Sequence, residues 1–256
     1  MLELCKMASE SQSSETRMKT ETVEYKDGDV TLRGYLAYDE KKSGKRPGVL
    51  VMPEAFGLGE HAKKRAERLA ELGYVAFAGD PYGNGVEVAS LPEAMKLATP
   101  LFTDPSKLRN RGRAALDHLA SLPQTDAGRL AAIGFCMGGT FSLELARDGA
   151  PLKGIVSFHG GVKTQRPAEP GKVKAKILVC TGADDTLIPV EEINGLAAEL
   201  TKAGADWQII TYGGAKHSFT NPLSDSIGMP GIGYNKLVDA RSWKAMADFF
   251  EEIFAS

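Results

Sequence analysis

The sequence has little cysteine and little histidine, with three cysteines and four histidines among 256 residues. Cys5, Cys136 and Cys180 form no closely spaced pair of the kind that binds zinc, so we expect no metal site. Three is also an odd number, which is a poor basis for a disulfide framework. The cysteines therefore indicate a reducing compartment, and we expect the protein in the cytoplasm.

The chain also lacks a marked excess of charge and any long apolar run. Lys and Arg number 31 against 33 Asp and Glu, which leaves a formal net charge of −2. Such a balance gives no support for nucleic acid or an anionic membrane surface as a partner. No stretch of about 18 apolar residues occurs, so we expect no membrane-spanning segment.

The N-terminal stretch has no apolar core either. Residues 1–20 are polar and rich in serine, which is unlike a secretory signal, and we interpret them as a disordered lead-in. The remaining residues, 21–256, are enough for one sizeable domain, and no composition break in them calls for two.

Within that domain, apolar strand-like runs alternate with helical patterns. An antiparallel hairpin is expected over 22–37, turning at Asp27 and Gly28. Later strands are expected at 47–52, 74–78, 130–133, 153–158, 173–180 and 207–212, and helices at 60–72, 91–102, 106–122, 140–146, 190–203 and 234–254. This alternation predicts an α/β domain, a mostly parallel sheet with helices on both faces.

The stretch that the rest of the chain surrounds is Gly134-Phe135-Cys136-Met137-Gly138-Gly139, between an apolar strand and a helix. Glycines beside a nucleophile permit a sharp strand-to-helix turn that lifts the side chain above the sheet edge. The free N–H groups of the helix lower the pKa of a thiol and stabilise an oxyanion. The pattern matches a nucleophile elbow with Cys136 in place of serine. The alternative is a buried cysteine beside a glycine-rich packing turn.

Candidate partners for Cys136 follow in a meaningful order. A nucleophile needs a base, and the base needs an acid that orients it. In α/β-hydrolases these groups occur in the chain order nucleophile, acid, histidine, and Cys136, Asp184 or Asp185, and His217 reproduce it. All follow predicted strands, at the sheet edge where sites form. Of the two acids we prefer Asp185, which lies deeper in the loop before Pro189.

The other polar residues suit structural roles. Asp80, just before a proline, is predicted to be a turn residue. His61 and His118 fall in predicted helices among charged neighbours and are expected to be solvated, whereas His159 ends a strand and could line a pocket. Cys180 lies in an apolar strand, where a small hydrophobic side chain suffices.

Four motifs together resemble the dienelactone hydrolase family: Pro53-Glu54-Ala55-Phe56-Gly57, the cysteine elbow, Gly182-Ala183-Asp184-Asp185, and His217-Ser218-Phe219. The resemblance covers the chain from about residue 22 to its end. It implies a compact α/β-hydrolase fold and hydrolysis of a small lactone or enol-lactone ester through a thioester acyl-enzyme, with no cofactor.

The resemblance also implies roles for matching residues. These are Cys136 as nucleophile, His217 as base, Asp185 as its orienter, Glu54 as a contact of the resting thiol, and the backbone N–H groups of Ala55 and Met137 as the oxyanion hole. The alternative for Glu54 is a solvated loop carboxylate. Tyr82, His159, Phe219 and Asn221 are expected to line the substrate pocket, with segment 221–234 as one wall.

Two departures from the family pattern concern the substrate. Members that act on dienelactones carry an arginine four residues after the histidine, where this chain has Asn221, and another in a segment where this chain has no arginine between Arg68 and Arg109. Asparagine does not replace the bidentate grip of a guanidinium on a carboxylate. The sequence therefore leaves open whether the substrate carries a carboxylate.

These observations lead to one interpretation and two alternatives. We expect a monomeric hydrolase of small esters or lactones that uses covalent thiol catalysis. A general short-chain carboxylesterase or thioesterase on the same triad is one alternative. A non-catalytic α/β-hydrolase-like protein that binds a small molecule is the other.

Overall fold

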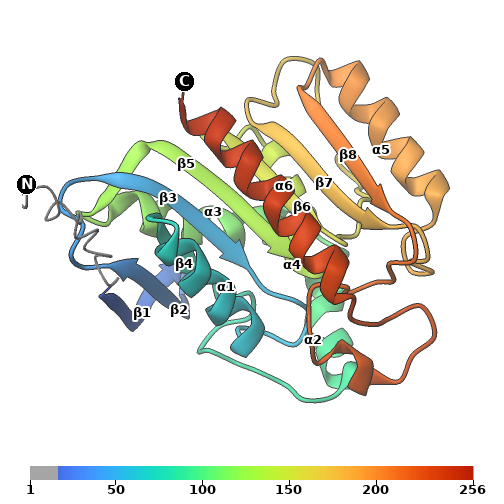
Figure 1. Cartoon of the computed structure of the whole chain (residues 1–256), viewed down its shortest axis with the longest axis horizontal. Coiled ribbons are helices and arrows are strands. Elements are labelled where there is room, and N and C mark those ends of the chain that lie inside the picture. The colour runs from blue at the N-terminus through green and yellow to red at the C-terminus, as the bar shows by residue number, and fades with distance from the viewer. Residues whose placement is uncertain (1–16, 256) are drawn as a thin grey trace, which may run out of the picture.

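A computed structural model describes residues 17–255. Its centre is an eight-stranded sheet in the order β1-β2-β4-β3-β5-β6-β7-β8, with helices packed on both faces (Figure 1). The pairings of β1 with β2 and of β2 with β4 are antiparallel, and every other pairing is parallel. The predicted α/β architecture with a mostly parallel sheet is therefore confirmed.

The described chain opens with the hairpin of β1 (Met18–Asp27) and β2 (Val30–Asp39). Asp27 pairs with Val30, and Gly28 adopts φ 56°, a conformation that costs glycine little. The hairpin was predicted, but over 22–37. The predicted end of the lead-in at residue 20 is too late, because β1 already begins at Met18. Residues 1–16, Cys5 among them, lie outside the described residues.

Strands and helices then alternate as the sequence predicts. The strands are β3 (Arg46–Met52), β4 (Val75–Ala78), β5 (Thr125–Phe135), β6 (Gly154–Phe158), β7 (Lys176–Gly182) and β8 (Trp207–Tyr212). The helices are α1 (Glu60–Glu71), α2 (Leu91–Phe102), α3 (Pro105–Ser121), α4 (Met137–Arg147), α5 (Val190–Ala203), α6 (Lys236–Ala255) and the short 3₁₀ helix η1 (Ser224–Ile227). Helix α4 starts at Met137, three residues before the predicted start. The prediction was late because Gly138 and Gly139 are weak helix formers, although both lie inside the helix.

Side chains of the central strands divide the core into two layers. Val49 and Val51 of β3 face one cluster, while Leu50 and Met52 face the other. The first cluster lies under α1 and α6, which cross the near face of the sheet in Figure 1. The second lies under α3, α4 and α5. This two-sided burial explains why the strands are continuous apolar runs.

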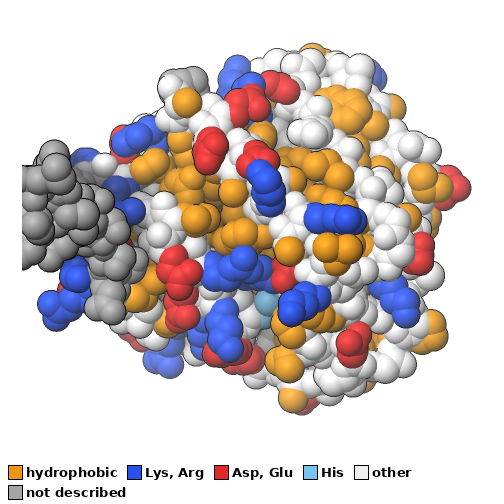
Figure 2. All heavy atoms as spheres, viewed as in Figure 1, with side chains coloured by type: hydrophobic (Ala, Val, Ile, Leu, Met, Phe, Trp, Pro, Cys, Tyr) orange, Lys and Arg blue, Asp and Glu red, His pale blue; other side chains and the backbone are white. Residues whose placement is uncertain are grey.

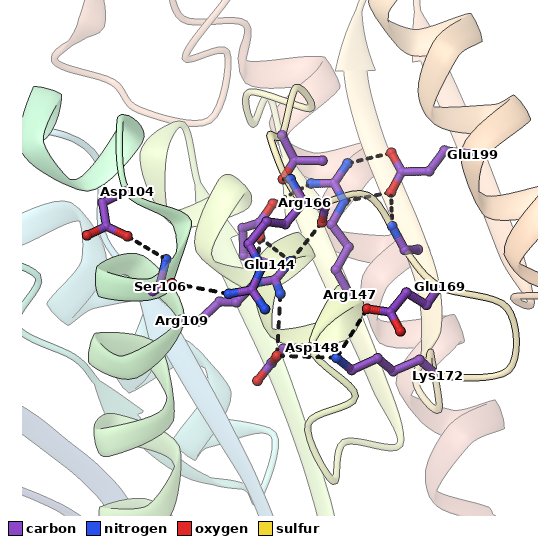
Figure 3. Close-up of polar contacts among 12 residues, drawn as sticks. Asp104, Ser106, Arg109, Glu144, Arg147, Asp148, Arg166, Glu169, Lys172 and Glu199 are labelled. Carbon is purple, nitrogen blue, oxygen red and sulfur yellow. Dashed lines mark hydrogen bonds and ion pairs between the residues drawn. The ribbon is translucent and has the colours of Figure 1, made fainter.

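A buried network of charges joins α3, α4 and α5 (Figure 3). The Glu144 carboxylate accepts hydrogen bonds from Arg109 Nε at 2.8 Å and from Arg147 Nη1 at 2.9 Å. Arg147 also binds Glu199, and both arginines donate to backbone carbonyls of the β6–β7 connection, those of Val162 and Arg166. The network therefore fixes α4, whose first turn carries the elbow.

The surface mixes charged and apolar side chains. Figure 2 shows Lys, Arg, Asp and Glu side chains among apolar ones on the face that carries α1 and α6. The most exposed large hydrophobic residues lie on separate elements, namely Leu72, Val190, Leu223 and Leu237. Across residues 17–255, no helix combines the length and apolar character needed to cross a membrane.

Candidate active site

Polar side chains gather beyond the carboxyl ends of the parallel strands. Glu54 follows β3, Cys136 follows β5, His159 follows β6, Asp185 follows β7, and His217 follows β8. Ligands and substrates bind at this edge in open α/β sheets. The order of the strands thus brings together residues that are far apart in the sequence.

The elbow places its strain on the nucleophile itself. Cys136 adopts φ 53° and ψ −116°, and His159 and Ser218 also have positive φ, at 42° and 56°. Three of the four such non-glycine residues in the described chain therefore lie at this site. The glycines serve close packing instead, because a Cβ on Gly134 would lie 1.8 Å from the Gly138 oxygen. This agrees with the prediction that glycines permit the sharp turn, because it requires positions without a Cβ.

One tyrosine contacts both residues whose backbone N–H groups are predicted to form the oxyanion hole. Met137 is the first residue of α4, where N–H groups have no acceptor within the helix. Ala55 lies in the loop after β3, and its carbonyl accepts a hydrogen bond of 2.6 Å from the Tyr82 hydroxyl, which also lies 3.5 Å from Met137 Sδ. Tyr82 therefore fixes the loop beside the elbow and remains partly exposed to a bound molecule.

The structure pairs His217 with Asp185. His217 Nδ1 lies 2.8 Å from Asp185 Oδ2, and both side chains are buried. The other oxygen, Oδ1, accepts the N–H groups of Leu187 and Ile188 at 2.9 and 3.1 Å, which fixes the carboxylate. Asp184 is exposed. Of the two acids left by the sequence, Asp185 is thus the one that orients the histidine.

The protonation of His217 depends on its two partners. Burial lowers the pKa of the imidazole, but the charge of the Cys136 side chain and the hydrogen bond with Asp185 outweigh burial and raise it to about 10. With Nδ1 engaged by Asp185, Nε2 is the nitrogen that can exchange a proton with the thiol. A cationic imidazole beside sulfur favours the nucleophilic thiolate.

Glu54 is buried, and its carboxylate bonds to a neighbouring loop. Its Oε2 accepts a hydrogen bond of 2.6 Å from Asn221 Nδ2 and lies 3.6 Å from His61 Nδ1. Its Oε1 has no hydrogen-bond partner among the described residues. Burial raises the pKa of the carboxyl above its ordinary value. The alternative of a solvated carboxylate is therefore wrong, and the contact with Cys136 that the resemblance implies stays a prediction.

His61 and His118 are corrections as well. The His61 side chain is only 11% exposed and packs edge-on against Phe135, and burial and Arg65 lower its pKa to about 3. His118 stacks on Tyr25, and its Nε2 is buried without a partner among the described residues. Charged neighbours in the sequence do not make these histidines solvated, because Arg65, which donates to His61 Nε2 at 3.2 Å, is itself buried.

Two of the four expected pocket residues belong to the protein interior. His159 is 1% exposed, and its ring nitrogens lie 3.1 Å from Cys136 N and 2.8 Å from Thr220 Oγ1. Phe219 is fully buried against His159 and Tyr212. The prediction that they line a substrate pocket is wrong, because neither side chain presents a free surface to a substrate.

Asn221 does line a pocket, next to Glu54. The pocket has a volume of about 220 Å³, and its walls include Phe56, Leu223 and Ile227. Part of the segment 221–234 thus forms a wall of this pocket, and that the pocket holds the substrate stays a prediction. The lining also includes the carboxylates of Glu54, Glu60 and Glu87 and contains neither lysine nor arginine. This pocket is therefore negatively biased.

Two residues set aside in the sequence prove structural. Asp80 is fully buried, and its carboxylate accepts backbone N–H groups from Arg33, Tyr82, Gly83 and Gly85, which confirms the turn role. Cys180 is buried in β7, where burial raises the pKa of its thiol to about 12. Among residues 17–255, no group of three or more His, Cys, Asp or Glu side chains is arranged to hold a metal ion.

Sheet topology, elbow and acid–histidine pair together define the class of α/β-hydrolases. Within that class, the model of the dienelactone hydrolase family matches residues 32–254, and the chain belongs to this family. It is therefore a dienelactone hydrolase-like hydrolase that acts on ester bonds.

Three relatives illustrate the match. A Yersinia pestis protein, named provisionally as a carboxymethylenebutenolidase, is 30% identical over 86% of this chain and 84% of its own length. The crystal structure of a dienelactone hydrolase-like promiscuous phosphotriesterase from metagenomic libraries is 44% identical, covers 92% of this chain and 98% of its own, and superposes with a TM-score of 0.88. A dienelactone hydrolase-type structure from Klebsiella pneumoniae is 26% identical, covers 91% and 98%, and has a TM-score of 0.74.

Proposed function

We propose that the protein hydrolyses a small ester or lactone through a thioester on Cys136. The observation that supports this most is the pair of His217 and Asp185 beside the elbow, in which the Cys136 side chain helps to raise the pKa of His217. A thiolate and an imidazolium in this arrangement form an activated nucleophile and a general acid.

The proposed reaction has two halves. Cys136 Sγ attacks the carbonyl carbon, and the N–H groups of Ala55 and Met137 bind the oxyanion. The intermediate collapses, the bond to the alcohol oxygen breaks, and that oxygen takes the proton from His217 Nε2. His217 then takes a proton from water, the resulting hydroxide adds to the thioester carbon, and the acid leaves as the thiolate re-forms.

The preferred substrates are uncharged. Asn221 stands where dienelactone-cleaving members carry an arginine, and its side-chain amide is engaged by Glu54. The adjoining pocket carries three carboxylates without a lysine or arginine. This supports the second candidate, a general short-chain carboxylesterase, over an enzyme for carboxylate-bearing dienelactones.

We infer that the enzyme acts as a monomer on small molecules in the cytoplasm. The separation of its exposed large hydrophobic residues on different elements supports the monomer. Its dependence on a free thiol supports a reducing compartment.

The test is intact-mass spectrometry after mixing with a panel of activated esters and lactones, with a neutral phosphotriester included because one relative hydrolyses such compounds. We expect an acyl adduct on the peptide that contains Cys136, no adduct in Cys136→Ala, and turnover of at least one panel member. Equal turnover by Cys136→Ala would refute the thioester route. Cys180→Ala is the matched control, because it removes a buried thiol away from the reaction.

A further inference from the structure

His159 uses both ring nitrogens inside the protein, and the reaction above assigns it no part. Its Nδ1 lies 3.1 Å from the backbone N of Cys136, and that N–H is the donor. A nitrogen that accepts an N–H carries no proton itself, so the neutral ring holds its proton on Nε2. That proton is donated to Thr220 Oγ1 at 2.8 Å. One imidazole therefore bridges two segments.

The two segments are those that carry the reacting groups. Cys136 is the strained residue of the elbow, and its backbone N–H donates both to the Phe158 carbonyl at 3.0 Å and to His159 Nδ1. The bridge therefore adds a second hold on the peptide on the N-terminal side of the Cys136 Cα. Thr220 belongs to the loop that carries His217. The ring of His159 also packs edge-on against that of His217, with 5.3 Å between centroids. The bridge thus joins the nucleophile to the general base.

Further hydrogen bonds hold the backbones of His159 and Thr220 in place. The backbone N–H of His159 donates to the Cys180 carbonyl at 2.8 Å. The Thr220 carbonyl accepts Arg65 Nη2 at 2.5 Å, and the same guanidinium binds Asp239 at 2.7 Å. Burial, followed by the nearby cations, keeps the pKa of His159 well below its ordinary value, so Nδ1 remains an acceptor.

We propose that His159 and Thr220 are positioning residues, which set the separation between the Cys136 sulfur and the His217 imidazole. Neither side chain reaches the substrate pocket, because both are 1% exposed. A misplacement of about 1 Å at reacting groups can reduce a rate about 100-fold. The inference rests on the proposed thiol chemistry, and it assigns the elbow a support outside the triad.

The first pair of variants is Thr220→Val against Thr220→Ser. Valine keeps the shape and removes the hydroxyl, which leaves the His159 Nε2 proton without its acceptor, whereas serine keeps the hydroxyl. We expect Thr220→Val to lower kcat about tenfold with little change in KM, and Thr220→Ser to stay within about threefold of the wild type.

The second pair tests the two ends of the ring separately. In His159→Asn the amide oxygen can replace Nδ1 at Cys136 but does not reach Thr220, and asparagine tolerates the positive φ of this position. In His159→Gln the side chain reaches toward Thr220 and gives up the elbow bond. The double variant His159→Asn with Thr220→Val should be no slower than the slower single variant, since both remove the same bond.

Two readouts separate positioning from simple support of the fold. The first is kcat per reactive Cys136 thiol, counted by limiting iodoacetamide and peptide mapping; loss of folded protein alone would leave it unchanged. The second is the alkylation rate of Cys136 at fixed pH, which we expect to fall at least threefold in Thr220→Val and which needs no ester substrate. Wild-type values of both in Thr220→Val, or multiplying effects in the double variant, would overturn the proposal. Failure of the thioester route alone would leave the alkylation result standing.

Discussion

At the scale of single residues, the site holds its reactive sulfur on a strained backbone. Cys136 adopts φ 53° and ψ −116°, a combination open to glycine and costly for other residues, at about 1–3 kcal/mol. Close packing around the elbow enforces this geometry, since a Cβ on Gly134 would meet α4 at Gly138 and a Cβ on Gly138 would meet Met52 at the end of β3. The strained backbone at Cys136 therefore lowers the stability of the fold at the residue whose partly exposed thiol is the proposed nucleophile.

This strain predicts the sign of a stability difference. Cys136→Gly should exceed Cys136→Ala in free energy of unfolding by about 1 kcal/mol, because glycine relieves the strained φ. Urea denaturation measures the difference. The matched pair is Cys180→Gly against Cys180→Ala in the regular strand β7, where glycine should be the less stable of the two. The same sign at both positions would show that Cys136 is unstrained.

The aspartate pair offers a second test. Asp185→Asn should lower kcat/KM roughly 100- to 10,000-fold, because the amide no longer stabilises the His217 imidazolium. Asp184→Asn, a change of the same chemistry at the exposed neighbour, should stay within about twofold. Steady-state kinetics on one activated ester compares them. A large loss in Asp184→Asn with an active Asp185→Asn would reverse the assignment.

His61 predicts a pH dependence of stability. Its folded-state pKa of about 3 lies below the value of about 6.5 in the unfolded chain, so below pH 6.5 the unfolded state binds a proton that the folded state does not. Stability should therefore fall as the pH drops from about 6.5 towards 3. His61→Gln should reduce the loss between pH 7 and 4.5 by roughly 2 kcal/mol.

Urea denaturation at a series of pH values measures this slope. Above about pH 7.5, the free energies of unfolding of the wild type and His61→Gln should change with pH in the same way, because the imidazole is neutral in both the folded and the unfolded chain. Glu54, whose pKa is raised by burial, titrates nearby and is common to both proteins. An unchanged slope in His61→Gln would show that His61 takes up its proton in the folded state.

At the scale of elements, α4 depends on charges at its end away from the elbow. Glu144 is 2% exposed and lies between Arg109 and Arg147, as Figure 3 shows. These arginines also hold the β6–β7 connection, and Thr140 in the first turns of α4 donates to the Gly161 carbonyl of the same connection. The helix is therefore fixed at both ends against one segment.

Removal of the central carboxylate should destabilise the protein strongly. Glu144→Ala removes the buried carboxylate that Arg109 and Arg147 share and leaves them only the less buried Asp148 and Glu199, so we expect a loss of about 3 kcal/mol in free energy of unfolding. Glu169→Ala removes a 72% exposed carboxylate from a surface pair with Lys172 and should cost less than about 1 kcal/mol. Urea denaturation compares the two, and a loss below 1 kcal/mol in Glu144→Ala would contradict a structural role for the network.

At the scale of the whole molecule, we propose that the pocket beside Glu54 influences which substrate charge the enzyme accepts. Three glutamates line the pocket: Glu54 after β3, Glu60 at the start of α1, and Glu87 in the loop before α2. Glu60 and Glu87 are exposed. The net charge of the whole chain, by contrast, is only −2. A local bias of this kind acts on a bound charge more than a net charge of −2 does. Discrimination should therefore depend on the pocket and on ionic strength.

A matched pair of esters tests this bias. An ester that carries a carboxylate should show kcat/KM at least about tenfold below its neutral isostere, and added salt should narrow the gap. Glu87→Gln should narrow it too, whereas Glu251→Gln, which removes the same charge from the exposed face of α6, should not. Equal turnover of both esters by the wild type would show that this pocket does not meet the substrate.

The sequence predicts those parts of the site that depend on neighbouring residues, and it does not predict those that depend on contacts between distant segments. The elbow at Cys136 and the loops that carry Asp185 and His217 follow from local apolar runs and chain order, so these elements were placed correctly. His61 was missed, because the side of a helix that faces a loop distant in the sequence is not encoded in local spacing. The same holds for Thr220, because its place just after His217-Ser218-Phe219 does not reveal that its hydroxyl meets His159.

The sequence by itself determined the alternation of strands and helices, the sharp turn at Cys136 and the chain order of the reacting groups, because short-range sterics and apolar periodicity control these. Only the tertiary structure decided which acid binds His217, that Glu54 is buried and bonds to Asn221, and that His159 joins the elbow to the loop of Thr220. Hydrogen-bond partners are chosen by which loops the sheet order brings together and by which polar groups lose water there. That choice belongs to the packed chain as a whole.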